Sequence, residues 1–215
     1  MFLSIKKVPK VSWSSDKPLN LKPKISTFIF LCFGLALFGL GEGLLIVSAA
    51  GASPWSVLAQ GISLNINFSI GIITIFISIG VLLLWLPLNQ RPGIGTILNA
   101  LIIALMIDFC IKFVPTPENY LSQLFLAILA VLTVGIGGGI YLVANLGSGP
   151  RDGLMIGLQQ KTNAPIASVR AFLEITVVSI GWYLGGTVGA GTLLFAFGIG
   201  PAVALGLYIV GKTFN

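Results

Sequence analysis

Long apolar runs, separated by short polar stretches, divide the chain into segments of membrane-spanning length. A helix that crosses the hydrocarbon core of a bilayer needs about 20 mostly apolar residues, and six runs reach or approach that length. They are residues 26–49, 69–88, 95–113, 121–145, 166–184 and 191–210. The pattern predicts an all-α polytopic membrane protein with about six transmembrane helices.

The composition indicates a surface that faces lipid. Charged residues make up only 8% of the 215 residues, whereas 56% are hydrophobic. A soluble domain of this size needs more polar groups to cover its surface. The basic residues lie in the first 25 positions and between the apolar runs. The net charge of +6 is therefore typical of membrane topology and indicates the lipid bilayer, not nucleic acid, as a partner.

The distribution of Lys and Arg predicts the orientation of the chain. Residues 1–25 are basic and contain three prolines, so we expect a disordered cytosolic tail. Short loops rich in Lys and Arg stay in the cytosol. If six spans alternate from this tail, eleven of the twelve basic residues lie inside, and Lys112 lies at an outer end. This predicts a bacterial cytoplasmic (inner) membrane protein with both termini in the cytosol.

The chain also matches itself, without a gap, at an offset of 96 residues. Twenty of the seventy positions in 39–108 are identical to their partners in 135–204, and many of them are Gly, Pro or Thr. Three spans in each copy would make the second copy enter the membrane from the opposite side. We therefore expect two inverted three-helix repeats, residues 26–113 and 114–212. Secondary transporters often share this construction, with a substrate site between the repeats.

Each copy contains a helix stop followed closely by a helix start. Gly permits a left-handed turn after a helix, and Pro suits the first position of the next one. The motif residues are Gly51, Ser53 and Pro54 in the first copy and Gly147, Gly149 and Pro150 in the second. The new helices, about 54–64 and 150–161, would be roughly 15 Å long, too short to span. Each is either re-entrant, with its amino terminus facing a buried ligand, or lies at the membrane interface.

Charges within the apolar part of the chain are the candidates for solute binding or gating, because a charge in the bilayer needs a partner or a protein environment. The candidates are Glu42, Arg151, Asp152, Arg170 and Glu174. Glu42 has no local cation. It is either protonated, which would suit a proton-coupled carrier, or paired with Arg151 or Arg170 across the bundle.

Other charges have a structural interpretation. The spacings of Asp108–Lys112 and Arg170–Glu174 are those of i, i+4 ion pairs on a helix. Asp152 lies in the first turn of its short helix. There its negative charge interacts favourably with the helix dipole, and its side chain can help to cap the helix. For Arg170 and Glu174, structural pairing and a role in gating both remain open.

The residue types disfavour catalysis and metal binding. The chain has no His, and its two cysteines, Cys32 and Cys110, lie within apolar runs. No spacing of these residues suggests a metal site, a disulfide or a cluster for acid–base chemistry. We therefore expect no enzyme activity, no cofactor and no metal.

Several segments resemble the YczE/YyaS/YitT family of bacterial multi-pass membrane proteins, in particular its YczE-like branch. They are GASPWSVLAQGIS, RPGIGTILNALIIALMID, GSGPRDGLMIGL and VRAFLEITVVSIGWYLGGTVGAGTLLFAFGIGP. The resemblance covers about residues 30–210 and excludes the basic tail. It implies a cytoplasmic-membrane location and a small helical bundle, and it brings no established substrate, cofactor or catalytic residue.

Two functions are compatible with this sequence. The first is a small-solute transporter or permease whose partners are the bilayer, an unknown small solute and a coupling proton. The second is a non-transporting accessory protein that supports a biosynthetic or export complex through helix packing. The two differ in whether Glu42 and the two helix starts converge on a common site that water can reach.

Overall fold

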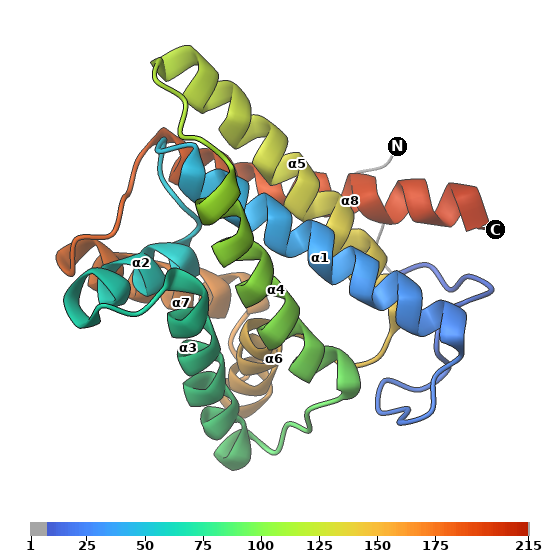
Figure 1. The fold of residues 1–215 in the computed structure, drawn as a ribbon. Helices are drawn as coiled ribbons and strands as arrows, with labels where there is room; N and C mark the ends of the chain where they lie inside the picture. The colour runs from blue at the N-terminus through green and yellow to red at the C-terminus, as the bar shows by residue number, and fades with distance from the viewer. Residues whose placement is uncertain (1–7, 215) are drawn as a thin grey trace.

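The computed structural model describes residues 8–214, and all regular structure in that range is helical (Figure 1). The elements are α1 (Ile25–Val47), α2 (Pro54–Ile66), α3 (Ile70–Trp85), a 3-10 turn (Leu86–Leu88), α4 (Ile94–Phe113), α5 (Tyr120–Ala144), α6 (Pro150–Thr162), α7 (Ile166–Tyr183) and α8 (Ala190–Phe214).

Six of these helices are long and apolar enough to cross a membrane: α1, α3 with its 3-10 turn, α4, α5, α7 and α8. Large apolar side chains cover much of their outer surface, among them Leu105, Phe172 and Phe197, which are 67%, 68% and 81% exposed. Such a surface is stable only in lipid. The prediction of an all-α protein with about six transmembrane helices is confirmed, and the predicted boundaries agree within four residues.

Helix α1 packs against α5, with α4 packed on α1 and α8 packed on α5. Glycines allow these contacts because their missing side chains let the backbones approach. A Cβ atom on Gly39 would lie 2.8 Å from Ile103 Cα in α4, and one on Gly135 would lie 2.3 Å from Ala202 Cβ in α8. The spaced glycines therefore serve helix packing.

The short helices α2 and α6 contact both α3 and α7 (Figure 1). Each begins among buried residues and ends at the surface. Ser56 near the start of α2 is 0% exposed, whereas Ile66 at its end is 48% exposed. In α6, Gly153 is buried and Thr162 is exposed. The predicted short helices are present, and both start inside the protein.

The 96-residue repeat is visible in the backbone. Eight residues between 8 and 214 have a positive φ, and all of them form pairs at this offset. The pairs are Ala49 with Asn145, Gly51 with Gly147, Asn67 with Asn163, and Asn89 with Gly185. Positive φ is uncommon outside Gly and Asn. The two halves therefore turn at the same positions even where the residue type differs.

Each half also donates a matching hydrogen bond to the other. Gly191 N–H donates to the Ala50 carbonyl at 2.7 Å, and Gly95 N–H donates to the Leu146 carbonyl at 2.8 Å. The two bonds are equivalent at the 96-residue offset, and each joins the start of a long helix in one half to the Gly turn of the other.

A threonine lies in the first turn of each of these two long helices, α4 and α8. Thr96 Oγ1 accepts from Gly93 N–H at 3.0 Å, and Thr192 Oγ1 accepts from Gly189 N–H at 3.2 Å. Each hydroxyl thus closes the first turn of its helix.

The expectation of a disordered tail over residues 1–25 is wrong for residues 8–24, and residues 1–7 lie outside the described range. Trp13 is 3% exposed and stacks on Phe30 at 4.5 Å between ring centroids. It also meets the edge of Phe214 at 5.8 Å. Ser15 N–H donates to the Ala144 carbonyl at 3.1 Å. The segment is ordered because it packs on α1, α5 and α8, which its local composition does not reveal.

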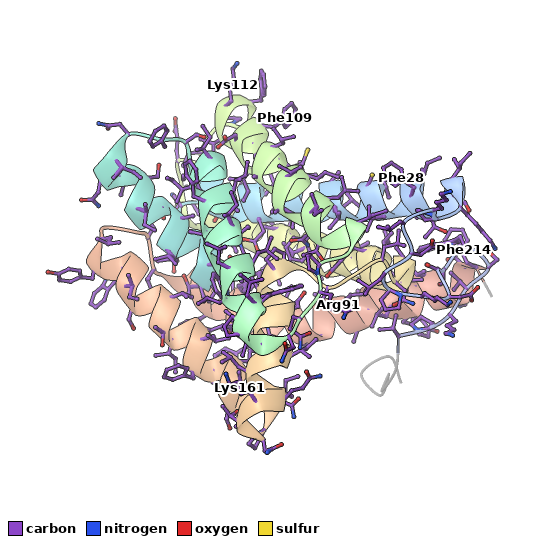
Figure 2. The ribbon with its side chains drawn as sticks, turned by 90° about the horizontal axis from the view of Figure 1, so that it is seen from below. Phe28, Arg91, Phe109, Lys112, Lys161 and Phe214 are labelled. Atoms are coloured by element: carbon purple, nitrogen blue, oxygen red, sulfur yellow. The ribbon has the colours of Figure 1, made fainter. Side chains whose placement is uncertain are left out.

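The predicted Asp108–Lys112 ion pair is also wrong. Asp108 accepts from the Ser69 hydroxyl at 2.6 Å and from Gly71 N–H at 2.8 Å. Its carboxylate therefore accepts hydrogen bonds from the start of α3 and does not pair with a cation on its own helix. Lys112 Nζ lies 5.3 Å from the Phe113 ring centroid, and Figure 2 shows Lys112 at the edge of the molecule opposite Lys161.

Candidate functional site

Glu42, on the last third of α1, is completely enclosed, with 0% of the residue exposed. Its Oε2 accepts hydrogen bonds from the Ser53 hydroxyl at 2.6 Å and from the Ser56 hydroxyl at 2.7 Å. These serines are the N-cap and third residue of α2. A buried carboxylate needs such donors, so the start of α2 forms one wall of the site.

The other carboxylate oxygen faces Arg151, in the first turn of α6. Arg151 Nη1 lies 3.7 Å from Glu42 Oε1, and the Arg151 side chain is 26% exposed. No hydrogen bond reaches this oxygen from the described residues. The sequence left both Arg151 and Arg170 as possible ion-pair partners of Glu42. In the structure the cation next to Glu42 is Arg151.

Arg151 and Trp55 occupy equivalent positions in the two copies, since their numbers differ by 96. The Arg151 guanidinium carbon lies 5.5 Å from the centroid of the Trp55 ring, a cation–π distance. The starts of α2 and α6 therefore lie next to each other, and both contact Glu42.

The start of α6 is held by two large side chains from other helices. Tyr141 Oη, on α5, accepts from Gly149 N–H and contacts Asp152 Oδ2 at 3.4 Å. Trp85 Nε1, at the end of α3, donates to the Pro150 carbonyl at 3.0 Å. These contacts fix where Arg151 enters the site.

The remaining candidate charges lie further out. Arg170 Nε donates to Glu174 Oε1 at 2.8 Å within α7, with the side chains 45% and 23% exposed. The predicted i, i+4 pair is confirmed. This pair lies on a helix that contacts α6, whereas Glu42 and Arg151 form a separate, central pair.

Neither short helix has a side-chain cap. No such hydrogen bond is present at Ser53, the N-cap of α2, or at Gly149, the N-cap of α6. The expectation that Asp152 helps to cap α6 is not met, because its carboxylate contacts Tyr141 instead. By contrast, Ser69 caps α3 and Asn119 caps α5. Both uncapped starts point their positive dipole ends toward the Glu42 region.

Glu42 is fully buried where the two helix starts converge, and three hollows lie elsewhere. A hollow of about 390 Å³ lies between residues 8–18 and the turn at Gly147 and Ser148. Two apolar hollows lie between α5 and α8. Glu42 and Arg151 line none of these, and the partly exposed Arg151 side chain is the part of the central pair that reaches the surface.

Sequence reasoning missed four residues of this site: Trp55, Ser56, Trp85 and Tyr141. Two of them, Ser56 and Trp55, could have been predicted from the sequence. Ser56 lies three residues after an N-cap Ser, and Trp55 is the repeat partner of Arg151. Trp85 and Tyr141 gave no signal, because aromatic residues in apolar runs are ordinary core residues.

Comparison with known proteins identifies relatives of similar length. A family model described as "Family of unknown function (DUF6198)" matches residues 25–207. A Haemophilus influenzae protein named "Uncharacterized protein" is 40% identical over 208 residues, 97% of this chain and 94% of its own. A match of that length includes much of the basic tail, which the sequence resemblance had left out.

Two Bacillus subtilis proteins are also similar. "Uncharacterized membrane protein YczE" is 34% identical over 79% of each chain. "Uncharacterized protein YyaS" is 26% identical over 78% of this chain and 85% of its own. No solved structure matches. The resemblance to the YczE-like proteins is confirmed, and this multi-pass membrane protein belongs to the DUF6198 family.

Proposed function

We propose that the protein is a small-solute carrier of the bacterial cytoplasmic membrane. The observation that carries this proposal is the meeting of two uncapped half-length helices, one from each copy, at a buried acid–base pair. Broken helices that meet between inverted repeats form the binding sites of many secondary transporters. The proposal assigns no catalytic residue, metal or cofactor.

In this proposal the two copies cross the membrane in opposite senses. The distribution of basic residues supports this orientation, because eleven of the twelve fall on the predicted cytosolic side, which cations favour. The exception, Lys112, lies at the edge of the molecule opposite Lys161 (Figure 2). The 8–24 segment contacts the end of α8 through Trp13 and Phe214, which supports cytosolic positions for both termini. Helices α2 and α6 would then be re-entrant, running from the middle to opposite faces.

The enclosure of Glu42 favours a second candidate, a non-transporting accessory protein of a biosynthetic or export complex. In that function the Glu42–Arg151 pair would fix the positions of helices α1, α2 and α6. A carrier, in contrast, must open this site alternately to each side. The two candidates differ in whether changes at the pair alter solute levels or only complex formation.

An untargeted metabolite comparison tests the proposal. Cells lacking the gene are compared with cells that overproduce the protein or its Glu42→Ala/Arg151→Ala double variant, at matched amounts in the membrane. We expect a small solute to change in opposite directions in deletion and overproducing cells, and the double variant to resemble the deletion. Unchanged solute pools, with loss of a partner complex in the deletion strain, would support the accessory function instead.

A further inference from the structure

We propose that Glu42 and Arg151 form a proton-linked binding site for a small monovalent anion. A proton that binds Glu42 Oε1 releases the Arg151 guanidinium, which then binds the anion. The proton and the anion would leave together when the ion pair forms again. This inference rests on the carrier function and specifies the chemical class of its solute.

The ion pair is incomplete on both sides. Glu42 Oε1 is buried and accepts no hydrogen bond from the described residues. Arg151, for its part, donates no side-chain hydrogen bond to them, although a guanidinium has five N–H donors. The two groups are 3.7 Å apart, beyond hydrogen-bond distance. A ligand can take the place of one member of such a loosely bonded ion pair. A tightly hydrogen-bonded pair would resist this replacement.

The surroundings of the pair favour an anion as the ligand. The starts of α2 and α6 lack side-chain caps, and free N–H groups at helix starts bind anions. The planar guanidinium of Arg151 lies over Trp55 and can bind a carboxylate or a similar anion through two parallel hydrogen bonds. In the described state, Glu42 itself is the anion that meets these positive groups.

Charge balance links the proton to the anion. The resting pair of ionised Glu42 and Arg151 is neutral, and so is protonated Glu42 with an anion on Arg151. Either ligand alone would leave a net charge in a site where an unpaired buried ion costs several kcal/mol. The proton and a monovalent anion therefore favour each other's binding, whereas a divalent anion leaves an excess charge.

Other titratable groups surround the pair without replacing either member. Helix α2 contributes only hydroxyl groups to Glu42. The titratable or charged neighbours on the other elements are Asp152 on α6, Arg170 and Glu174 on α7, Tyr141 on α5 and Cys110 on α4. Asp152 directly follows Arg151 in the chain, and Glu174 lies on α7, which contacts α6. These two carboxylates allow a competing outcome, in which a cation binds Glu42 and Arg151 turns toward them.

The first test measures binding and proton uptake by the purified full-length protein in weakly buffered detergent. The probes are sodium formate, sodium acetate and sodium nitrate, with sodium sulfate as a divalent anion and methylammonium sulfate as the cation. We expect the monovalent anions to bind with uptake of equal numbers of protons. Because each anion is expected to bind together with one proton, its affinity should fall about tenfold for each unit by which the pH is raised.

Three variants assign the effect to the pair. Glu42→Gln keeps an oxygen that the serines can donate to, so anion binding should remain while proton uptake and its pH dependence disappear. Arg151→Gln should lose anion binding. Glu118→Gln removes a carboxylate from an exposed position and should match the parent protein. Thermal unfolding of each variant in detergent verifies that it is folded, and Arg151→Lys, which keeps the charge, provides a second test if Arg151→Gln is not.

Several results would overturn this inference. The first is methylammonium binding that requires Glu42 in the absence of anion binding. The second is anion binding that survives in folded Arg151→Gln or is undiminished in Arg151→Lys, which cannot form two parallel hydrogen bonds. The third is anion binding without proton uptake in the parent protein. Flux of nitrate and protons in proteoliposomes then separates the inference from the carrier function. Coupled binding without flux contradicts the carrier and leaves the site intact. Flux of another solute that neither anions nor protons affect supports the carrier and rejects this site.

Discussion

At the scale of single residues, the carboxylate of Glu42 depends on hydroxyl groups from another helix. Ser53 and Ser56 are 1% and 0% exposed, and both donate to the same carboxylate oxygen. Hydrogen bonds to a charged group contribute more than those between neutral groups. The two serines therefore fix the start of α2 against α1 as well as the orientation of Glu42.

We predict that Ser53→Ala and Ser56→Ala each lower the free energy of unfolding by about 1–3 kcal/mol, because the buried carboxylate loses a donor that water cannot replace. Thermal unfolding in detergent measures the effect. Ser179→Ala, at an exposed position on α7, is the matched control and should change the free energy by less than about 0.5 kcal/mol. Equal effects at all three positions would contradict the structural role of the pair.

At the scale of elements, the turns before α2 and α6 depend on glycine. Gly51 has a φ of 114° and Gly147 a φ of 113°, a region that residues with a Cβ rarely adopt. A Cβ on Gly51 would also lie 2.5 Å from Gly189 N in the other half. The turn thus requires glycine both for its conformation and for the contact between the two copies.

Gly51→Ala should therefore lower the free energy of unfolding by at least about 1–3 kcal/mol, the usual cost of backbone strain. The comparison is Gly80→Ala within α3, where an added Cβ would have no neighbour within 4 Å. That change should leave stability equal or raise it by up to about 1 kcal/mol, since Ala is the better helix former. A result in which Gly80→Ala is the more harmful change would refute the assignment of the turn.

The 8–24 segment is the element whose order depends most on distant contacts. We predict that Trp13→Ala lowers the free energy of unfolding by about 3–5 kcal/mol, because it removes a large buried aromatic side chain that packs on Phe30 and Phe214. Leu21→Ala, at a residue 78% exposed, should have little effect. Hydrogen exchange of residues 8–24 provides a second measurement, and equal exchange in the parent protein and the Trp13 variant would contradict the packing.

At the scale of the whole molecule, the arrangement of the two copies decides whether a carrier mechanism is possible. The equivalent turns and reciprocal hydrogen bonds relate the halves to each other, whereas the proposed bilayer orientation rests on the distribution of charge alone. Ile66 is the last residue of α2, and Thr162 is the last residue of α6. The two positions are equivalent at the 96-residue offset, so inverted copies would expose them on opposite faces of the membrane.

We predict that Ile66→Cys is labelled by a membrane-impermeant maleimide in intact cells. Thr162→Cys should be labelled only after the membrane is opened. Cys32 and Cys110 are replaced by Ala in both variants, and the Cys-free protein is the control. Labelling of both positions from the same side would exclude inverted repeats and remove the basis of the carrier proposal.

Several features of the site were predictable and others were not. The six spans, the short helices and the Arg170–Glu174 pair follow from patterns within a few turns of one helix. The partner of Glu42 was open between Arg151 and Arg170, and the partner of Asp108 was predicted incorrectly. Both depend on which helices lie side by side, and spacing along one helix carries no information about that.

The sequence by itself determined that the protein crosses a membrane, where its helices lie and that it contains a repeat. Apolar length and the positions of glycine and proline are local properties with strong physical consequences in lipid. Only the tertiary structure decided that the starts of α2 and α6 meet around Glu42 and that Trp13 orders the segment before α1. Those contacts join residues distant in the chain, so packing and not local propensity selects them.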